Sequence, residues 1–333
     1  MRVSLRAPSF EDVDKVTRCM QDAETVRWLS SIPVPYSRED AIDFVGRSAL
    51  ASDRCILVDG QFAGMIRTGA DLGYWVAPEF RGRGVARNAA QLAMMQYFQQ
   101  STEPAKAWHF IGNDVSRRVL LSVGFRDVEE TVMNWQGDID MPAKMMRLTA
   151  RDMLGALEIR TGRCRINALR DADMPELHRI VTSPQVARML LRFAPGQTQS
   201  DVDALIRPAM NTLHRPMRLA VRHEGRFIGT IGVNDGPSPM IFYFLAPEVA
   251  GRGIASEIVP AFCDTVQDWF GLDDLSAVVF TDNPASRRVL EKAGFAVEFE
   301  NAAKSAGREG MSTGWYMRRH QAGSPPQDDR APA

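Results

Sequence analysis

Two glycine-rich turns contain the residue types that could bind a phosphate group. The first, Arg81-Gly82-Arg83-Gly84-Val85-Ala86, stands between an apolar run and the start of a helical pattern. Glycines let a backbone turn sharply and bring its N–H groups close to a ligand. The helix that follows adds unpaired N–H donors and the positive end of its dipole, and arginines pair with phosphate oxygens. The turn predicts a phosphate or pyrophosphate site, although a single such turn is more typical of a connection without a ligand.

The turn occurs twice because the chain repeats itself. Residues 74–86 and 243–255 are identical at eight of thirteen positions, and so are residues 113–125 and 283–295. The second turn reads Gly251-Arg252-Gly253-Ile254-Ala255. The offset between matched residues grows from 161 to 170 along the chain, as insertions in surface loops produce. Recurrence of the turn between the same strand and helix favours the interpretation as a binding site.

Two diverged copies of one domain account for the length of the chain. The 333 residues correspond to roughly two domains at about 150 residues each. We expect a first domain over residues 1–155 with an intact turn and a second over residues 156–320 with a degenerate one. The segment 321–333 lacks apolar periodicity and is expected to be a disordered tail.

Each copy has the same expected order of elements around its turn. A short strand and an amphipathic helix come first, with a capping box at Ser9 and Asp12 in the first copy. Two strands across a tight turn follow, then an apolar strand, the glycine turn, a long helix, another strand and a short helix that ends at Gly-Phe. This order predicts an α/β (α+β) fold in which a mixed, mostly antiparallel central sheet is flanked by helices.

Composition and spacing exclude several classes of ligand and partner. The net charge is −1, so neither nucleic acid nor a membrane is expected as a partner. Four scattered cysteines and five histidines lack metal-ligand spacing, so we expect no metal and reduced thiols in a cytoplasmic protein. Arg87 and Ser256 stand where a dinucleotide fingerprint needs Gly or Ala, and the Gly-Lys-Ser/Thr of a P-loop does not occur. The ligand of the turns is therefore expected to be neither a dinucleotide nor a nucleoside triphosphate.

With these motifs the sequence resembles the GNAT superfamily of N-acetyltransferases. The pattern is Arg81-x-x-Gly84-x-Ala86 after Ala-Pro-Glu, then Asn113-x-x-Ser116 and a closing Gly-Phe, and it covers both copies. The strand before the turn looks most like the branch that acetylates N-termini of ribosomal proteins. The resemblance implies two tandem GNAT-like domains, acetyl-CoA as co-substrate and direct attack by an amine in a ternary complex.

The resemblance also assigns coenzyme contacts position by position. Backbone N–H groups of the turn would hold the pyrophosphate, the preceding strand would bind the pantetheine arm, and an asparagine at the start of the next helix would contact that arm. The corresponding residues are Val76, Arg81, Gly82, Arg83, Gly84, Val85, Ala86 and Asn113 in the first copy, and Leu245, Gly251, Arg252, Gly253, Ile254, Ala255 and Asn283 in the second.

Three residues are catalytic candidates by the same resemblance. Ser116 and Ser286 match a hydroxyl able to protonate the departing thiolate, since Leu120 and Leu290 stand where many members of the family have a tyrosine. Asp71 matches a carboxylate beside the central strand that could act as the general base. The other interpretation of Asp71 is an ordinary strand-end aspartate in solvent.

The two copies differ at positions that bear on activity. The second copy has Ala250 in place of Arg81 and Met240 in place of Asp71. We therefore expect the first copy to be catalytic and the second to bind coenzyme weakly or to shape the acceptor site. His109, in an expected strand, is interpreted as a structural residue rather than as the base.

The expected function is acetyl-CoA-dependent transfer of an acetyl group to a primary amine. The acceptor would be a peptide or protein N-terminus or a small amine, and the chain a homodimer or a monomer whose two copies form an internal pseudo-dimer. The alternative is a non-catalytic acyl-CoA-binding or sensor protein, which the missing tyrosine and the unassigned base support.

Overall fold

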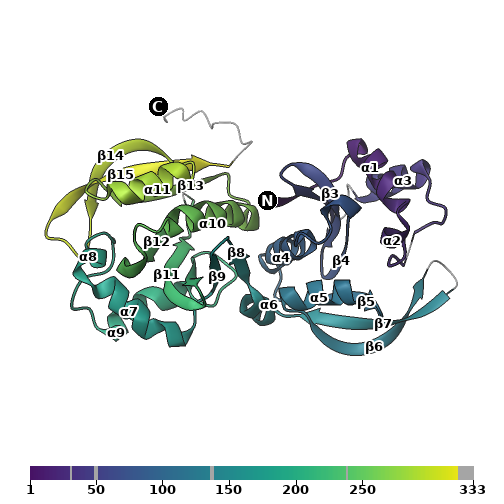
Figure 1. The fold of residues 1–333 in the computed structure, drawn as a ribbon, viewed down its shortest axis with the longest axis horizontal. Coiled ribbons are helices and arrows are strands. Elements are labelled where there is room, and N and C mark those ends of the chain that lie inside the picture. Colours follow the sequence, from purple (N-terminus) through teal and green to yellow (C-terminus); the bar gives the residue numbers. More distant parts are fainter. Residues whose placement is uncertain (31, 49–51, 136–138, 238, 322–333) are drawn as a thin grey trace. The chain divides into compact units, whose positions relative to one another are not determined.

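The strands of each repeat form sheets of their own in the computed structural model, which describes residues 1–30, 32–48, 52–135, 139–237 and 239–321. The chain divides into Met1–Leu157, here unit 1, and Glu158–Ala333, here unit 2. Both units have the mixed, mostly antiparallel sheets flanked by helices that the sequence predicts (Figure 1). Most of the expected tail, residues 322–333, lies outside the described residues.

Unit 1 is built on one seven-stranded sheet in the order β1-β2-β3-β4-β5-β7-β6. All neighbouring strands are antiparallel except β4 and β5, which run parallel. Asp59 (φ 49°) and Gly60 (φ 82°) form the predicted tight turn between β2 and β3, with the positive φ angles that a type I′ hairpin turn requires. The strands are Val3–Arg6 (β1), Asp53–Val58 (β2), Gln61–Thr68 (β3), Asp71–Val76 (β4), Ala105–Phe110 (β5), Arg126–Trp135 (β6) and Ile139–Leu148 (β7).

Several helices of unit 1 begin at residues whose side chains cap them, among them Asp22, Asn113 and Thr149. The capping box at Ser9 and Asp12 is present, with the Ser9 N–H donating to Asp12 Oδ2 at 3.0 Å. Helix α4 packs against β1, β3 and β4, and α5 packs against α4 and β5. The helices are Val13–Met20 (α1), Ala23–Val26 (α2), Arg38–Ser48 (α3), Val85–Phe98 (α4), Asp114–Val123 (α5) and Ala150–Ala156 (α6).

Unit 2 repeats this plan with its sheet in two parts, β12-β11-β10-β9-β8 and β13-β15-β14. The strands are Glu158–Arg160 (β8), Cys164–Ala168 (β9), Met217–His223 (β10), Arg226–Val233 (β11), Ile241–Leu245 (β12), Asp274–Phe280 (β13), Ala296–Lys304 (β14) and Met311–His320 (β15). The helices are Met174–Thr182 (α7), Pro184–Ala187 (α8), Gln199–Ile206 (α9), Ile254–Phe270 (α10) and Pro284–Lys292 (α11).

One glycine is required at the same place in both sheets. Gly64 on β3 and Gly229 on β11 have φ near 150°, 147° and 149° respectively. A Cβ on Gly64 would overlap the carbonyl oxygen of Trp75, and one on Gly229 would overlap that of Phe244. The neighbouring strand of each hairpin carries a register shift beside these glycines. The same β-bulge therefore occurs in both units, beside Gly64 in unit 1 and beside Gly229 in unit 2.

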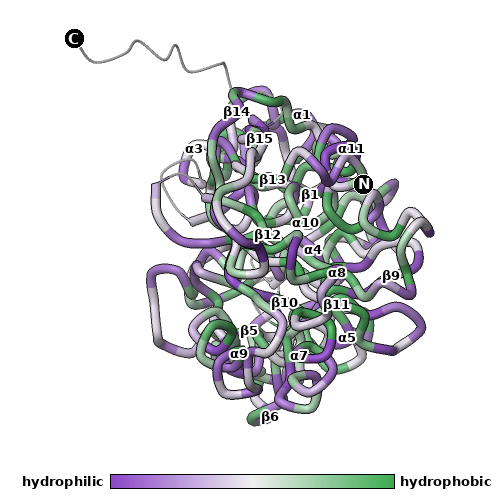
Figure 2. Tube along the Cα trace, turned by 90° about the vertical axis from the view of Figure 1, so that its left-hand side faces the viewer, coloured by the Kyte–Doolittle hydropathy of each residue, from purple (hydrophilic) through white to green (hydrophobic). Residues whose placement is uncertain are grey.

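Apolar side chains from strands and helices fill both interiors. In unit 1 the fully buried side chains include Ile56, Ile66, Met94 and Phe125, each stabilising the fold by about 1.5–3 kcal/mol. The four cysteines are free and buried. Hydrophobic and hydrophilic residues alternate along the chain (Figure 2), and no described helix combines the length and apolarity of a membrane span.

Candidate active site

Each unit opens a cavity where two parallel strands separate. In unit 1, β4 and β5 pair only at Asp71↔Lys106 and Leu72↔Ala107, and the rest of both strands lines a cavity of about 710 Å³. In unit 2 the equivalent strands meet at one bridge, Met240↔Ser276, beside a cavity of about 1000 Å³. Splayed strands expose backbone N–H and C=O groups that a sheet would otherwise pair, so they can bind an extended ligand.

The glycine turn of unit 1 has the geometry of an anion cradle. Gly82 and Gly84 have φ angles of 73° and 77°, and a Cβ on either would meet nothing within 4 Å. Helix α4 begins at Val85 with no side-chain cap, which leaves its first N–H groups available. The predicted residues Val76, Arg81, Gly82, Gly84, Val85, Ala86 and Asn113 line the cavity, whereas Arg83 does not.

Unit 2 has the same cradle. Gly251 and Gly253 have φ angles of 74° and 73°, and α10 begins directly after them with no side-chain cap. The predicted residues Leu245, Gly251, Gly253, Ile254, Ala255, Asn283 and Ser286 line the cavity, whereas Arg252 does not. Because neither Arg83 nor Arg252 lines its cavity, the backbone N–H groups of the two glycine turns are the groups placed to contact a phosphate at these positions.

The side chain of Arg81 is bonded to protein groups. Its Nη2 donates to Asp22 Oδ2 at 2.8 Å and to the hydroxyl of Thr25, and its Nε donates to the Val76 carbonyl at 3.2 Å. Asp22 caps helix α2 by accepting from the Thr25 N–H at 2.9 Å. Hydrogen bonds from Thr25 and Arg81 hold the pKa of the Asp22 carboxyl below its usual range. Arg81 thus ties the glycine turn to α2.

Unit 2 lacks this whole connection. Ser183 stands at the N-cap position of α8, as Asp22 does in α2, but its side chain makes no capping hydrogen bond. Val186 stands in place of Thr25, and Ala250 in place of Arg81. The three differences occur together, which indicates that the arginine and its helix-cap partners work as one group.

A tyrosine–serine pair recurs in both units and was not predicted from the sequence. Tyr74 on β4 has its hydroxyl 3.1 Å from Ser116 Oγ, and Tyr243 on β12 has its hydroxyl 2.7 Å from Ser286 Oγ. Burial raises the pKa of both tyrosines to about 12. The signal was available, because both tyrosines open the repeated segment. Each tyrosine therefore brings an aromatic hydroxyl to its cavity from the strand. Leu120 and Leu290, on the helices, carry no hydroxyl.

The two asparagines predicted to contact the coenzyme arm act first as helix caps. Asn113 Oδ1 accepts from the Ser116 N–H at 3.1 Å, and Asn283 Oδ1 accepts from the Ser286 N–H at 3.1 Å. Each asparagine therefore fixes the first turn of its helix and with it the serine that meets the tyrosine. Both asparagines also line their cavities.

Two side chains at the cavity of unit 1 are candidates for the general base. Asp71, at the start of β4, is exposed and lines the cavity. His109, on β5, also lines the cavity but is only 7% exposed. Its Nδ1 lies 3.0 Å from the Phe110 carbonyl oxygen, while Nε2 is buried without a hydrogen-bond partner. A carbonyl only accepts, so in the neutral imidazole Nδ1 carries the proton and Nε2 presents a lone pair.

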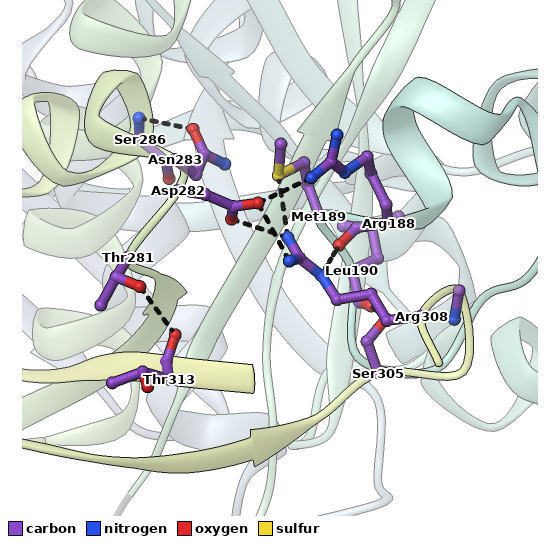
Figure 3. A network of polar contacts seen from close by, with 11 residues as sticks. Arg188, Met189, Leu190, Thr281, Asp282, Asn283, Ser286, Ser305, Arg308 and Thr313 are labelled. Carbon is purple, nitrogen blue, oxygen red and sulfur yellow. Dashed lines mark hydrogen bonds and ion pairs between the residues drawn. The ribbon is translucent and has the colours of Figure 1, made fainter. Parts of the chain in front are cut away.

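The last hairpin of each unit contacts the residue that follows the short second helix. In unit 2, Arg308 donates to the Arg188 carbonyl and pairs with Asp282 at 2.8 and 3.0 Å, and Arg188 pairs with the same carboxylate at 2.7 Å (Figure 3). In unit 1 the indole N–H of Trp135 donates to the Arg27 carbonyl at 3.1 Å. Arg27 and Arg188 both follow the short second helix of their unit, so the hairpin contacts the same carbonyl in both.

The sequence matches the family of acetyltransferase (GNAT) domains over residues 2–126 and 163–296. The chain belongs to this family of acyltransferases, with one GNAT domain in each unit. Over 81 residues it is 38% identical to the uncharacterized N-acetyltransferase YoaA of Bacillus subtilis (strain 168), a stretch that covers 23% of this chain and 46% of that protein. The match therefore spans less than half the length of this relative.

Two solved structures of acetyltransferases are among those with partial similarity to the chain. Spermidine N-acetyltransferase from Vibrio cholerae is 17% identical, with 48% of this chain and 96% of that chain covered at a TM-score of 0.43. RimJ of Mycobacterium smegmatis, in complex with CoA-disulfide, is 22% identical, with 51% and 88% covered at a TM-score of 0.42. Among the described residues no cluster of three or more His, Cys, Asp or Glu side chains could hold a metal ion.

Proposed function

We propose that the chain transfers an acetyl group from acetyl-CoA to a primary amine and that unit 1 carries out the chemistry. The observation that carries this proposal is His109, which lines the same cavity as the glycine cradle and the Tyr74–Ser116 pair and whose buried Nε2 has no hydrogen-bond partner. Unit 2 has Val279 in place of His109 and Met240 in place of Asp71. Neither Val279 nor Met240 has a side chain that could accept a proton.

The residues present fit acetyl-CoA, which supplies an activated acetyl group when bound. Open space over Gly82 and Gly84 and an uncapped helix start suit a pyrophosphate. The free edges of β4 and β5 suit the amide groups of an extended arm. The same cradle in unit 2, with the positive φ angles of Gly251 and Gly253, supports binding of a second coenzyme molecule there.

His109 would accept a proton from the attacking amine. An amine attacks only when unprotonated, and reference pKa values are ~8 for a protein N-terminus and ~10.4 for a lysine-type amine. A base in the cavity therefore increases the fraction of productive encounters. The Phe110 carbonyl fixes the ring orientation of His109 and leaves Nε2 as the accepting atom. Asp71, being exposed, would at most add negative potential at the rim.

The Tyr74–Ser116 pair would donate a hydrogen bond to the sulfur that leaves. The pKa of Tyr74 is raised to about 12 by burial, whereas a thiol has a pKa of ~8.5. Full proton transfer from Tyr74 to a thiolate would therefore be uphill by ~5 kcal/mol, at 1.36 kcal/mol per pKa unit. A hydrogen bond without transfer avoids this cost and still stabilises the developing charge.

The test is an acetylation assay of the full chain. Acetyl-CoA is incubated with a panel of primary amines that includes a polyamine, a peptide with a free N-terminus and an amino-acid amide, and products are identified by mass spectrometry. We expect at least one amine to be acetylated, and the rate to fall at least tenfold in His109→Gln. If the chain binds coenzyme but acetylates no amine above the buffer control, the non-catalytic alternative replaces this proposal.

A further inference from the structure

Unit 2 buries an arginine that has no carboxylate partner. Arg218 on β10 is 9% exposed. Its Nη1 donates to Thr230 Oγ1 at 2.6 Å, while its Nε is buried with no hydrogen-bond partner. Among the described residues no aspartate or glutamate forms an ion pair with it. Burial, with the nearby charge of Arg192, lowers the pKa of Arg218 to about 9, so the group is still mainly charged at neutral pH.

This arginine lines the cavity of unit 2 among aromatic side chains. Its guanidinium lies 4.3 Å from the ring centroid of Phe242 and 5.9 Å from that of Phe244. The charged residues that line the cavity are Arg192, Arg218, Arg288 and Lys292 against one acid, Asp235. An excess of cations around an apolar cavity is the arrangement that an anionic ligand with an apolar body would complete.

Unit 1 provides an internal comparison. Ile56 pairs with Gly64 and Val221 pairs with Gly229, so Arg218 holds the register position of Asp53. Asp53 is paired with Arg67 at 3.3 Å, and Met65 stands where unit 2 has Thr230. The shared fold thus forms without a buried arginine at this place. Since an unpaired buried charge opposes folding, its presence in unit 2 points to a ligand.

We propose that the cavity of unit 2 binds a small organic carboxylate, with the anion on Arg218 and the apolar body against Phe242 and Phe244. The unused Nε donor and the adjacent Nη group match the two oxygens of a carboxylate. Rings on which the guanidinium already stacks offer flat contact area to an aromatic or aliphatic body. The proposal does not rest on acetyl transfer in unit 1.

The first experiment measures binding directly. The full chain is titrated by calorimetry with phenylacetate, indole-3-acetate and hexanoate, and with the neutral amide of each acid. We expect at least one acid to bind at least tenfold more tightly than its amide. This preference should be lost in Arg218→Met and retained in Arg226→Met, which makes the same change at an exposed position of the adjacent strand β11. If no acid is preferred over its amide, or if the preference survives in Arg218→Met, the proposal is wrong.

A second measurement needs no ligand. Arg218→Met removes an unpaired buried charge, so without added carboxylate the variant should unfold at the same temperature as the native chain or higher. A marked decrease in unfolding temperature would assign Arg218 a structural role and contradict the proposal. Arg218→Lys, which keeps the charge, should retain part of the preference for acid over amide.

A third experiment distinguishes two roles for the bound carboxylate, acceptor of the acetyl group and effector. Phenylalanine carries a carboxylate, an aromatic body and an amine, and phenylalaninamide lacks only the anion. With acetyl-CoA present, acetylation of phenylalanine that depends on Arg218 would make the ligand an acceptor in unit 2 and would overturn the assignment of acetyl transfer to unit 1 alone. Binding without acetylation would make it an effector of the enzyme.

Discussion

The hydroxyl of Tyr74 lies 3.1 Å from Ser116 Oγ, and across the repeat Tyr243 and Ser286 stand 2.7 Å apart. In both units the serine is fixed by the asparagine that caps its helix. A strand tyrosine and a helix serine thus meet at the wall of each cavity. The chain has kept this pair in both domains, whereas His109 and the Arg81–Asp22 ion pair occur in unit 1 alone.

Two coenzyme molecules should bind to each chain. Native mass spectrometry with CoA should show a stoichiometry of two, because both glycine cradles have the same backbone geometry. Gly84→Val and Gly253→Val should each reduce it to one, since a β-branched residue at φ near 75° costs about 1–2 kcal/mol and displaces the turn. A stoichiometry of one that only a single variant abolishes would show that one cradle is inactive.

Removing the imidazole of His109 should slow acetyl transfer and leave a space that free imidazole can occupy. His109→Ala should lower kcat/KM by about 100-fold, the usual contribution of a general base, and added imidazole should restore part of the rate. Asp71→Asn is the matched control, and it should change the rate less than threefold because this carboxylate is exposed. Loss of activity in Asp71→Asn with little effect in His109→Ala would assign the base to Asp71.

The Arg81–Asp22 ion pair should act on the acceptor side of the site. Glu24 and Thr25 of helix α2 line the cavity, and so does Trp28, two residues after the helix ends. Asp22→Asn should therefore raise KM for the amine by about tenfold, the loss of ~1.4 kcal/mol of a charge-assisted contact, with less effect on coenzyme binding. If Arg81 serves mainly as a phosphate ligand, Asp22→Asn would instead free it and tighten coenzyme binding.

Glu257 should make unit 2 sensitive to acid. Burial raises the pKa of this carboxyl, but hydrogen bonds from the Thr161 hydroxyl and from Arg163 outweigh burial and lower the pKa to about 2. The carboxylate accepts from the backbone N–H and Nε of Arg163, both at 2.7 Å. A lowered pKa in the folded state contributes stability above the ordinary glutamate pKa of ~4.3, and this stability is lost as the pH falls toward 2.

Thermal unfolding measured at several pH values tests this assignment. Glu257→Gln should destabilise unit 2 by about 1–3 kcal/mol at pH 7, and the difference from the native chain should shrink below pH 4. Glu291→Gln, in an exposed pair with Arg287, should have little effect at any pH. Equal destabilisation by Glu257→Gln at pH 7 and at pH 2 would contradict the proposed ionic contribution.

Repetition made the fold and the cradles predictable from the sequence. Two copies of one pattern identified the turn before α4 and α10, and glycine spacing fixed the residues that need positive φ. The capping box at Ser9 and the hairpin turn at Asp59 and Gly60 were predicted correctly, because their signals lie within a few residues of one another. Local geometry of this kind depends on local sequence.

Contacts between distant segments were beyond prediction. The contact of Arg81 with Asp22, 59 residues away, was not predicted, because no local pattern links the two residues. His109 was expected to be structural, and its bond to the Phe110 carbonyl agrees with this. The place of this residue in the cavity lining depends on the separation of β4 and β5, which are distant in the sequence. Arg218 was missed because it precedes the apolar run that signalled its strand.

The most direct test of the account compares two matched variants, Tyr74→Phe and Tyr243→Phe, in acetyl transfer. Each removes one hydroxyl from the equivalent position of its unit. The two substitutions are therefore chemically identical and are made at the same place in the fold. If unit 1 is catalytic, Tyr74→Phe should lower kcat at least tenfold, while Tyr243→Phe should leave kcat within twofold of the native value. The reverse pattern, or equal losses in both variants, would contradict the assignment of catalysis to unit 1.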